Sequence, residues 1–390
     1  MNARIVLICA FAVTTSCGGG GGEPPLPSKF LYASVYSVGS GGATSGAIYA
    51  FGVDPGGTLS PVSGSPFAPP SDGAPIAITR DSKFLYSVDS ATGKLLAFQI
   101  HSDGSLTAVP GAPFSTPDRP LGLVAHPTAD FLYVSSDIAG SLTVFGSLTV
   151  FAIDSATGAL SLTSSVTLSN NLTTNAAAIT PDGRYLYQDG GYPSAPQIAG
   201  FSTNSSTGAL STVPGSPLSP TNFAFFPGPM AVDPAGKFLY VSNSFEASSF
   251  GGPLAAYSID AVSGALTAVP GSPFDVGGIQ YYGVAIDASG RFLIVDITHP
   301  KMPGNCLAVL SIDPDTGALT SVPGSPFGQI CGLVAADPLE PYVYIGGNYG
   351  SPPGGGVYVL SMDHATGALA PMGSVTFPGK TVVSSIALTH

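Results

Sequence analysis

The sequence predicts an all-β protein, a seven-bladed β-propeller with four antiparallel strands per blade. Three observations lead to this fold class. The chain has 51 glycines and 37 prolines among 390 residues, and both residue types break helices when they stand inside them. Hydrophobic residues make up 44% of the chain, which favours a large packed core over disorder. Finally, one unit of about fifty residues recurs seven times, a period found in propellers.

The repeated unit starts with a motif like Phe-Leu-Tyr-Val. Its copies follow one another at intervals of 47 to 54 residues and begin at Phe30, Phe84, Phe131, Tyr185, Phe238, Phe292 and Tyr342. Each copy continues with a second apolar stretch, a turn of the form Asp-x-x-Thr/Ser-Gly-Ala-Leu, a Val-Pro-Gly-Ser-Pro-Phe segment and a short Ala-rich stretch. Four β-rich segments in a unit of this length are typical of one propeller blade.

The order of the segments predicts how the ring closes. The repeats open at Phe30 with the second strand of a unit, and the chain ends with an Ala-rich first strand over Ser385–Thr389. The innermost strand of blade one must therefore come from the C-terminus. That pairing leaves no open sheet edge between the first and last blades, and it makes residues 29–390 one propeller domain.

Residue size varies across the unit as a wedge-shaped blade requires. One position of the Ala-rich strand is alanine in six of the seven copies: Ala77, Val124, Ala178, Ala231, Ala285, Ala335 and Ala387. Small side chains fit where the blades converge on the axis, because larger ones would overpack there. The Phe-Leu-Tyr strand is apolar on both faces, as expected between two neighbouring sheets. The prolines of the Val-Pro-Gly-Ser-Pro-Phe segment suit an outer sheet edge.

A short duplication lies within the third copy. Ser141–Gly146 (SLTVFG) is almost repeated by Ser147–Ala152 (SLTVFA). Because six residues are an even number, the alternation of faces is preserved. Either copy could therefore form the third strand of blade three.

One turn is similar in sequence to a metal-binding loop. Asp313 begins the sequence DPDTG, which resembles the start of a calcium loop. The same turn occurs with a single acid at Asp154 and Asp363. A hairpin turn, in which Asp bonds to the backbone and Gly adopts a positive φ, explains all of them. We therefore predict no metal site.

The first 28 residues predict export and a lipid anchor. Residues 1–16 carry Arg4 before an apolar run of nine residues, which is too short to span a membrane but has the size of a secretion signal. Small residues lead to Cys17, the cysteine that a bacterial lipoprotein signal would leave as the lipidated N-terminus. Residues 17–28 form a Gly- and Pro-rich tether. An ordinary signal peptide with an incidental cysteine is the alternative.

These features predict a protein of the bacterial cell envelope, at the outer membrane, in the periplasm or at the cell surface, that touches a membrane only through its anchor. Cys306 and Cys331 remain once Cys9 and Cys17 are assigned to the leader, and in an exported protein they predict a disulfide; buried free thiols are the alternative. The net charge of −12 argues against nucleic acid, which needs a cationic face. We expect a monomer without a cofactor.

The repeats resemble the seven-bladed propellers of the lactonase family, which includes 6-phosphogluconolactonase-like proteins and relatives with Tyr-Val-Thr-Asn repeats. The resemblance rests on Asp233–Asn243 (DPAGKFLYVSN), on Thr180–Tyr187 (TPDGRYLY) and on the Asp-x-x-Thr/Ser-Gly-Ala-Leu turns, and it covers essentially residues 29–390. It implies the propeller fold and hydrolysis of a sugar lactone. Enzymes of the family are similar in carrying a histidine near the start of an innermost strand; other residues stand at the matching positions Pro75, Leu121, Asn175, Pro229, Gly283 and Gly332.

For hydrolysis, the sequence offers four candidates. A carboxylate, Glu246 or Asp296, would activate water, and Arg119 would hold the oxyanion. His299 lies in a loop between a second and a third strand. We expect a hydrolase if these four residues converge within about 4–6 Å in one pocket with perturbed pKa values.

The loops that enter the first strands share one face with those that join the second and third strands. They carry the residues that predict ligand binding: Asp118, Tyr192, Phe225, Phe245, Tyr281, Tyr282 and Lys301. Clustered exposed aromatics suit stacking on sugars or docking a protein, although they could equally cap the blades. The main prediction is an exported, lipid-anchored propeller that binds a carbohydrate, an envelope component or a protein partner. The alternative is a lactonase-like hydrolase acting on a sugar lactone or ester.

Overall fold

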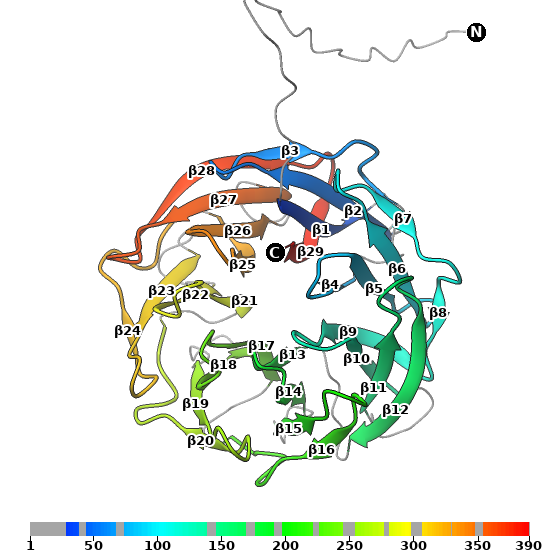
Figure 1. Cartoon of the computed structure of the whole chain (residues 1–390). Coiled ribbons are helices and arrows are strands. Elements are labelled where there is room, and N and C mark those ends of the chain that lie inside the picture. The colour runs from blue at the N-terminus through cyan, green and yellow to red at the C-terminus, as the bar shows by residue number, and fades with distance from the viewer. Residues whose placement is uncertain are drawn as a thin grey trace, which may run out of the picture.

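The computed structural model describes residues 29–38, 44–67, 74–138, 146–168, 176–190, 197–220, 226–244, 254–276, 281–297, 306–328, 330–347 and 354–389. Within these ranges the chain forms strands and turns but no helix, and so no helix long and apolar enough to cross a membrane. The described strands build seven sheets that stand around a common axis (Figure 1). The predicted seven-bladed propeller is confirmed.

In the first four blades, the strands run in order from the axis to the rim. Blade 1 contains β29 (Thr381–Leu388), β1 (Lys29–Val38), β2 (Thr44–Val53) and β3 (Leu59–Pro61). Blade 2 contains β4 (Ile76–Ile78), β5 (Phe84–Asp89), β6 (Lys94–Ile100) and β7 (Leu106–Ala108), and β8 (Phe114–Ser115) also pairs with β6. Blade 3 contains β9 (Arg119–Ala125), β10 (Phe131–Asp137), β11 (Gly146–Ile153) and β12 (Leu160–Leu168). Blade 4 contains β13 (Ala177–Ile179), β14 (Tyr185–Gly190), β15 (Gln197–Thr203) and β16 (Leu210–Thr212).

The other three blades follow the same order. Blade 5 contains β17 (Phe226–Val232), β18 (Phe238–Ser244), β19 (Ala255–Ile259) and β20 (Leu266–Ala268). Blade 6 contains β21 (Tyr281–Ile286), β22 (Phe292–Ile297), β23 (Leu307–Ile312) and β24 (Leu319–Ser321). Blade 7 contains β25 (Gly332–Ala336), β26 (Tyr342–Gly347), β27 (Gly356–Met362) and β28 (Leu369–Thr376).

The pairing of β1 with β29 closes the ring. Tyr32 lies opposite Ala387 in this antiparallel pair. At its end, the Phe30 N–H donates to Thr389 Oγ1 at 2.8 Å, and the Thr389 N–H donates to the Phe30 carbonyl at 2.9 Å. Lys29 also forms an ion pair with Asp337, the residue that follows β25 in blade 7. The predicted closure by the C-terminal strand is thus confirmed.

The predicted small position of the innermost strand faces a tyrosine. Ala77 lies opposite Tyr86 and Ala178 opposite Tyr187. The other pairs are Val124–Tyr133, Ala231–Tyr240, Ala335–Tyr344 and Ala387–Tyr32, with Ala285–Ile294 in blade 6. These tyrosines are buried. A small side chain towards the axis leaves room for each ring, because protein interiors are packed to near-crystalline density.

The first aromatic ring of each second strand packs on a glycine of the next blade. The pairs are Phe30–Gly104, Phe84–Gly158, Phe131–Gly208, Tyr185–Gly264, Phe238–Gly317, Phe292–Gly367 and Tyr342–Gly57. Each glycine belongs to an outer hairpin and has a φ of +71° or more. A Cβ added to any of the first six would lie 2.3–2.7 Å from a ring atom, and at Gly57 it would lie 3.3 Å away. Only glycine therefore satisfies both the turn and the contact.

A tyrosine hydroxyl reinforces four of these contacts. Two residues after the packed ring, Tyr32 donates to the Gly104 carbonyl at 2.9 Å and Tyr86 to the Gly158 carbonyl at 2.8 Å. Tyr187 and Tyr240 make the same bond to Gly264 and Gly317. Each bond joins two blades between which the described residues form no strand pairing. Side-chain contacts of this kind therefore hold the described parts of the blades together.

An aspartate opens several of the outer hairpins and bonds to its own turn. Asp154 Oδ1 accepts the N–H groups of Ala156 and Thr157 at 3.0 and 2.8 Å. Asp313 Oδ1 does the same with the N–H groups of the second and third residues after it. The interpretation of this segment as a hairpin turn is confirmed. In the described ranges, no three His, Cys, Asp or Glu side chains are grouped so that they could hold a metal ion.

The Val-Pro-Gly-Ser-Pro-Phe segment does more than end the outer strand. In blades 1, 2, 4, 5 and 6 the outer strand is only three residues long, and the chain then turns back onto the third strand of the same blade. In blade 5, for example, Ser272 Oγ accepts the Ala256 N–H at 3.0 Å and Phe274 pairs with Leu254. Two short pieces thus cover one sheet edge, which blocks pairing with another chain.

The structure assigns one copy of the duplicated SLTVF sequence. Ser147–Ala152 lies in β11 and pairs with β10. The first copy, Ser141–Gly146, lies outside the described residues except for Gly146, which opens β11.

A glycine substitution tests the contact between blades. We expect Gly158→Ala to destabilise the protein by roughly 2–5 kcal/mol, because it adds strain at a φ of +75° and forces Cβ to within 2.4 Å of the Phe84 ring. Gly93→Ala is the matched control, since its φ is +67° and no atom lies within 4 Å of the added Cβ. Urea unfolding should show a loss of only about 1–2 kcal/mol for the control. Equal losses in both variants would contradict a role for the ring contact.

Candidate functional site

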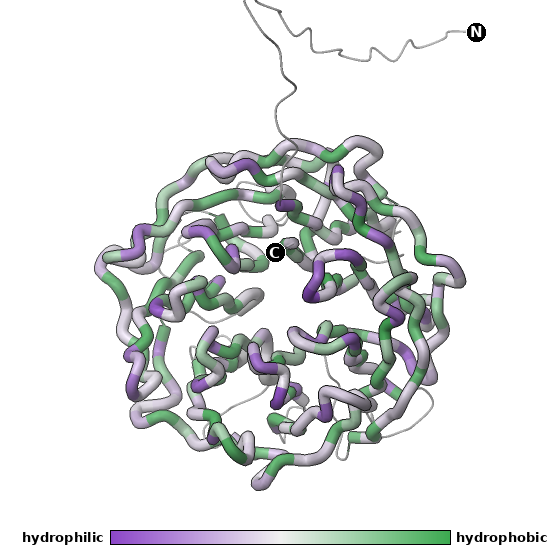
Figure 2. The backbone as a smooth tube through the Cα atoms, in the orientation of Figure 1, coloured by the Kyte–Doolittle hydropathy of each residue, from purple (hydrophilic) through white to green (hydrophobic). Residues whose placement is uncertain are grey.

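Buried polar side chains lie at both ends of the ring. Because all blades repeat the same strand order, their second strands end on the same side of the ring, which we call the carboxyl end. The last residues of these strands include the buried polar residues Ser34, Asp89, Ser135, Gln188, Asp189 and Asp296. Elsewhere the strands are largely hydrophobic, and Figure 2 shows that hydrophilic stretches gather mainly where the chain turns. Polar groups inside such a fold need partners. At the opposite end they close turns, as Thr180 does for the Tyr185 N–H and Asp233 for the Phe238 N–H, so the carboxyl end is the candidate site.

Asp296 is the strongest candidate for an acid–base group at this end. It is the fifth residue of β22 and is only 1% exposed. Its Oδ1 accepts a hydrogen bond from the Gly332 N–H at 3.1 Å, across the seam between blades 6 and 7. Burial raises the pKa of Asp296 to about 7, and the bond from Gly332 opposes this rise only in part. A carboxyl that is half ionised near neutral pH suits general acid–base catalysis.

A disulfide lies next to Asp296 in the chain and across the seam. Cys306 and Cys331 are bonded, with their Cα atoms 5.1 Å apart. The Cys306 carbonyl accepts the Ile297 N–H at 2.6 Å, and Cys331 precedes Gly332. The disulfide therefore links Cys306, directly before the strand that follows Asp296, to Cys331. Cys331 is the neighbour of Gly332, whose N–H donates to Asp296. Gly332 itself has no room for a side chain, since an added Cβ would lie 1.9 Å from the Gly346 carbonyl oxygen.

Arg119 stands in another part of the ring. It opens β9 in blade 3, whereas Asp296 lies in blade 6, and these blades are not neighbours (Figure 1). The Arg119 Nε donates to Asp137 Oδ1 at 2.8 Å, and a terminal nitrogen pairs with Asp137 Oδ2. Asp118 accepts a hydrogen bond from Ser147 Oγ at 2.7 Å. The structure thus pairs Arg119 with Asp137 and does not bring it to Asp296.

The other predicted site residues lie largely outside the described residues. This holds for Glu246 and His299 among the catalytic candidates, for Cys17, and for the binding candidates Tyr192, Phe225, Phe245 and Lys301. Tyr281 and Tyr282 form the start of β21, and only their backbone is described. Convergence of the four catalytic candidates therefore stays a prediction.

Three of the positions that match the family's histidine fall in β-bulges. Leu121 is the extra residue of β9, Pro229 belongs to an irregularity in β17, and Gly283 to one in β21. Bulges re-aim side chains and are common beside active sites. At Gly283 an added Cβ would lie 2.4 Å from the Val334 N of blade 7. A side chain at this bulge would therefore collide with the next innermost strand.

His126 has a structural role at the opposite end of the ring. Its Nδ1 accepts the N–H groups of Thr128 and Ala129 at 3.1 and 3.0 Å. Burial lowers its pKa, so the neutral ring is the favoured form. Asp233 closes the corresponding turn of blade 5 by accepting the Lys237 and Phe238 N–H groups at 2.6 and 2.7 Å. His126 therefore closes its turn in blade 3 as Asp233 does in blade 5.

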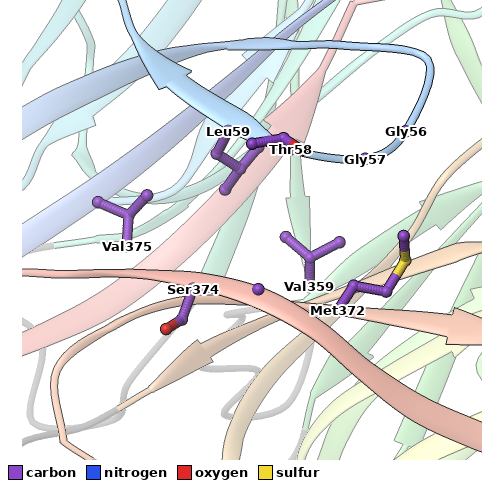
Figure 3. A pocket seen from close by; sticks show the side chains of 9 residues that line it. Gly56, Gly57, Thr58, Leu59, Val359, Met372, Ser374 and Val375 are labelled. Atoms are coloured by element: carbon purple, nitrogen blue, oxygen red, sulfur yellow. The ribbon is translucent and has the colours of Figure 1, made fainter. Parts of the chain in front are cut away.

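A cavity at the rim lies away from these groups. It has a volume of about 180 Å³ and lies between β3 of blade 1 and β28 of blade 7 (Figure 3). Its lining is glycine backbone with small and apolar side chains, such as Leu59, Val359 and Met372, and holds no ionisable group. The cavity marks the seam where the ring closes and offers no acid–base chemistry.

The fold and its buried carboxyls define the class: a seven-bladed propeller with candidate acid–base chemistry at one end of its ring. A family model described as "Lactonase, 7-bladed beta-propeller" matches residues 30–148 and 146–331. The chain therefore belongs to this lactonase family of seven-bladed β-propellers.

Several known proteins are similar to the chain. A candidate 6-phosphogluconolactonase from Bacteroides fragilis has the same fold with a TM-score of 0.70 at 19% identity, over 95% of this chain and 100% of that one. A periplasmic gluconolactonase from Pseudomonas aeruginosa superposes with a TM-score of 0.68 at 17% identity, over 93% and 99%. A 6-phosphogluconolactonase from Formosa agariphila is 39% identical over 67 residues, which is 17% of this chain and 18% of that protein.

The pKa of Asp296 predicts a pH dependence of stability. Between an unfolded-state value of about 3.9 and a folded-state value of about 7, the folded chain holds a proton that the unfolded chain releases. Raising the pH through this window should therefore lower the free energy of unfolding by up to about 1.4 kcal/mol per pH unit. Urea unfolding between pH 5 and 8 should show this loss relative to Asp296→Asn. Parallel pH profiles of the two proteins would contradict the raised pKa.

Proposed function

We propose that the protein is a hydrolase of sugar lactones. The observation that carries the proposal is Asp296, a carboxyl that is buried at the carboxyl end of a lactonase-family propeller and whose pKa is raised to about 7. Lactone hydrolysis needs a group that takes a proton from water and returns one to the leaving oxygen. A single carboxyl with a pKa near the working pH can do both.

The reaction follows from that group. The Asp296 carboxylate removes a proton from water as the water oxygen forms a bond to the lactone carbonyl carbon. The tetrahedral adduct then collapses, the bond from that carbon to the ring oxygen breaks, and the ring oxygen takes the proton back from Asp296. The product is the open hydroxy acid. The Gly332 N–H holds Asp296 Oδ1 and thereby fixes the orientation of the carboxyl.

The charges around Asp296 favour a lactone without a phosphate. Among the described residues, desolvation and the Gly332 N–H account for the pKa of Asp296, and no charged group contributes. A phosphate group would call for nearby cations. Arg119 at the same end is engaged by Asp137, and the whole chain carries a net charge of −12. We therefore propose a neutral aldonolactone as the substrate class.

Enzyme kinetics test this proposal. We expect the protein to hydrolyse D-glucono-1,5-lactone with a kcat/KM at least tenfold higher than for the 6-phosphorylated lactone. The rate should rise with pH through about 7, because the ionised form of Asp296 is the base. Asp296→Asn should lose roughly 10²–10⁴-fold in kcat.

Asp189→Asn is the matched control. Asp189 is the fifth residue of β14, the strand position that Asp296 occupies in β22, and its Oδ1 accepts the Ala176 N–H of its own blade at 2.9 Å. It should keep its activity. An Asp296→Asn protein as active as the wild type would overturn the assignment of the base.

The binding function predicted from the sequence remains the competing hypothesis. Its aromatic residues lie outside the described residues or are described only as backbone, so the structure adds nothing to it. Absence of turnover on any lactone, together with retention on an immobilised glycan or envelope fraction, would favour it.

We also propose that the protein is exported and anchored by a lipid on Cys17. Lys29 begins β1, so the tether joins the propeller at the end opposite to Asp296. An anchored protein would then present the carboxyl end away from its membrane.

Lipidation can be tested in the native host. We expect radiolabelled palmitate to enter the wild-type protein, which should fractionate with the membrane. Cys17→Ser should remain unlabelled, while the lactonase activity of the purified propeller is unchanged. Labelling of the Cys17→Ser variant would contradict the proposed anchor.

A further inference from the structure

The seam between blades 3 and 4 holds a cluster of buried polar atoms without hydrogen-bond partners. Ser135 of β10 lacks a partner for its Oγ, Gln188 of β14 for both Oε1 and Nε2, and Gln197 of β15 for Oε1. Gln188 is fully buried and Ser135 is 2% exposed. Four unpaired polar atoms thus occur in one seam of the described structure.

Strand register places these side chains on facing surfaces. Ser135 lies opposite Leu148, and Gln188 lies opposite Ala199. Leu148 and Ala199 belong to the same hydrophobic cluster, which fills the seam. Cross-strand neighbours point to the same face of a sheet, so Ser135 and Gln188 face each other's blade. Gln197 lies opposite Gly190, two residues after Gln188, and therefore shares the face of Gln188.

The fold does not require a glutamine at this position. The equivalent residues in the other blades are Ala33, Ser87, Val134, Val241, Val295 and Ile345. Ser87 has a partner, since its Oγ donates to the Pro75 carbonyl at 3.0 Å. A buried polar group without a partner opposes folding, whereas an apolar side chain of similar shape would not. Such a local conflict with stability is typical of a functional position.

Small residues flank the cluster, and an ion pair lies beside it. Gly122 lies opposite Ser135, and Ala177 and Ala199 flank Gln188. Asp137 follows Ser135 on the same face and is paired with Arg119, whose side chain is 54% exposed. This pair carries no net charge. The seam therefore offers amide and hydroxyl groups beneath a neutral ion pair, a set that matches neutral hydroxyl groups.

We propose that the seam between blades 3 and 4 is a binding site for a small polyol or sugar, with the Gln188 amide donating to one hydroxyl and accepting from another. Ser135 and Gln197 supply further hydrogen bonds, and Arg119 and Asp137 form the entrance. No pairing between described strands crosses the seam, so the blades can part locally without breaking a described backbone ladder. This site is separate from Asp296 and does not depend on lactone hydrolysis.

Thermal unfolding with xylitol as the probe tests the site. Without xylitol, Gln188→Leu should melt at the wild-type temperature or about 1–3 °C above it, because it removes unpaired buried atoms. Xylitol should then raise the melting temperature of the wild type in a saturable way. The variant should show only the linear increase that polyols give through exclusion from protein surfaces. Calorimetry should find binding to the variant at least tenfold weaker.

Ser87→Ala is the matched control for this experiment. It removes a partnered hydroxyl from the equivalent position in blade 2, so it should lower the melting temperature and keep the saturable response to xylitol. A Gln188→Leu protein that melts well below the wild type would show that Gln188 has a partner in the protein, and it would overturn the proposal. Identical linear responses of wild type and variant would do the same, as would a crystal structure grown in xylitol with only water beside Gln188.

Discussion

The contact between an aromatic ring and a hairpin glycine is the interaction on which the ring of blades depends. It recurs at all seven seams, including the one that closes the ring through Tyr342 and Gly57. The described strands form no hydrogen bonds between neighbouring blades, so side-chain packing holds the blades in place. Because glycine has no Cβ, the aromatic ring packs directly against its Cα. The two sheets therefore lie closer together than they could with any other residue at the position of the glycine. In four of the seams, the tyrosine hydroxyl two residues later also donates to the carbonyl of the same glycine.

The packing of the aromatic ring on glycine constrains the first residues of the second strands and leaves their last residues free to vary. The strand starts are almost uniform, whereas the fifth residues are Ser34, Val88, Ser135, Asp189, Ser242, Asp296 and Gly346. Uniform packing at one end fixes the position of each blade, so a polar residue at the other end does not endanger the fold as a whole. Natural proteins violate local packing rules mainly where function requires it. The carboxyl end has this character in the seams that contain Gln188 and Asp296.

The sequence alone was enough to predict the fold, because the features that determine it are local and repeated. The position of Phe30 within its unit predicted closure by the C-terminal strand, and the small residues predicted the innermost strands. The site could not be predicted in the same way. The partner of Arg119 is Asp137, 18 residues away, and the partner of Asp296 is an amide of the next blade. Bulges at Leu121 and Gly283 also leave no trace in the strand pattern.

Asp189 and Asp296 show how one strand position acquires different chemistry. Both are the fifth residue of a second strand, and both accept one backbone amide. Asp189 takes its amide from Ala176 of the same blade, so its bond depends on a single sheet. Asp296 takes its amide from Gly332 of the next blade, where the Cys306–Cys331 bridge holds the two blades together. Burial at this seam removes the carboxyl of Asp296 from bulk solvent, which disfavours its charged form and raises its pKa. The repeat thus places a carboxyl at the same strand position in both blades, and the contacts at each seam determine which blade donates the amide that binds it.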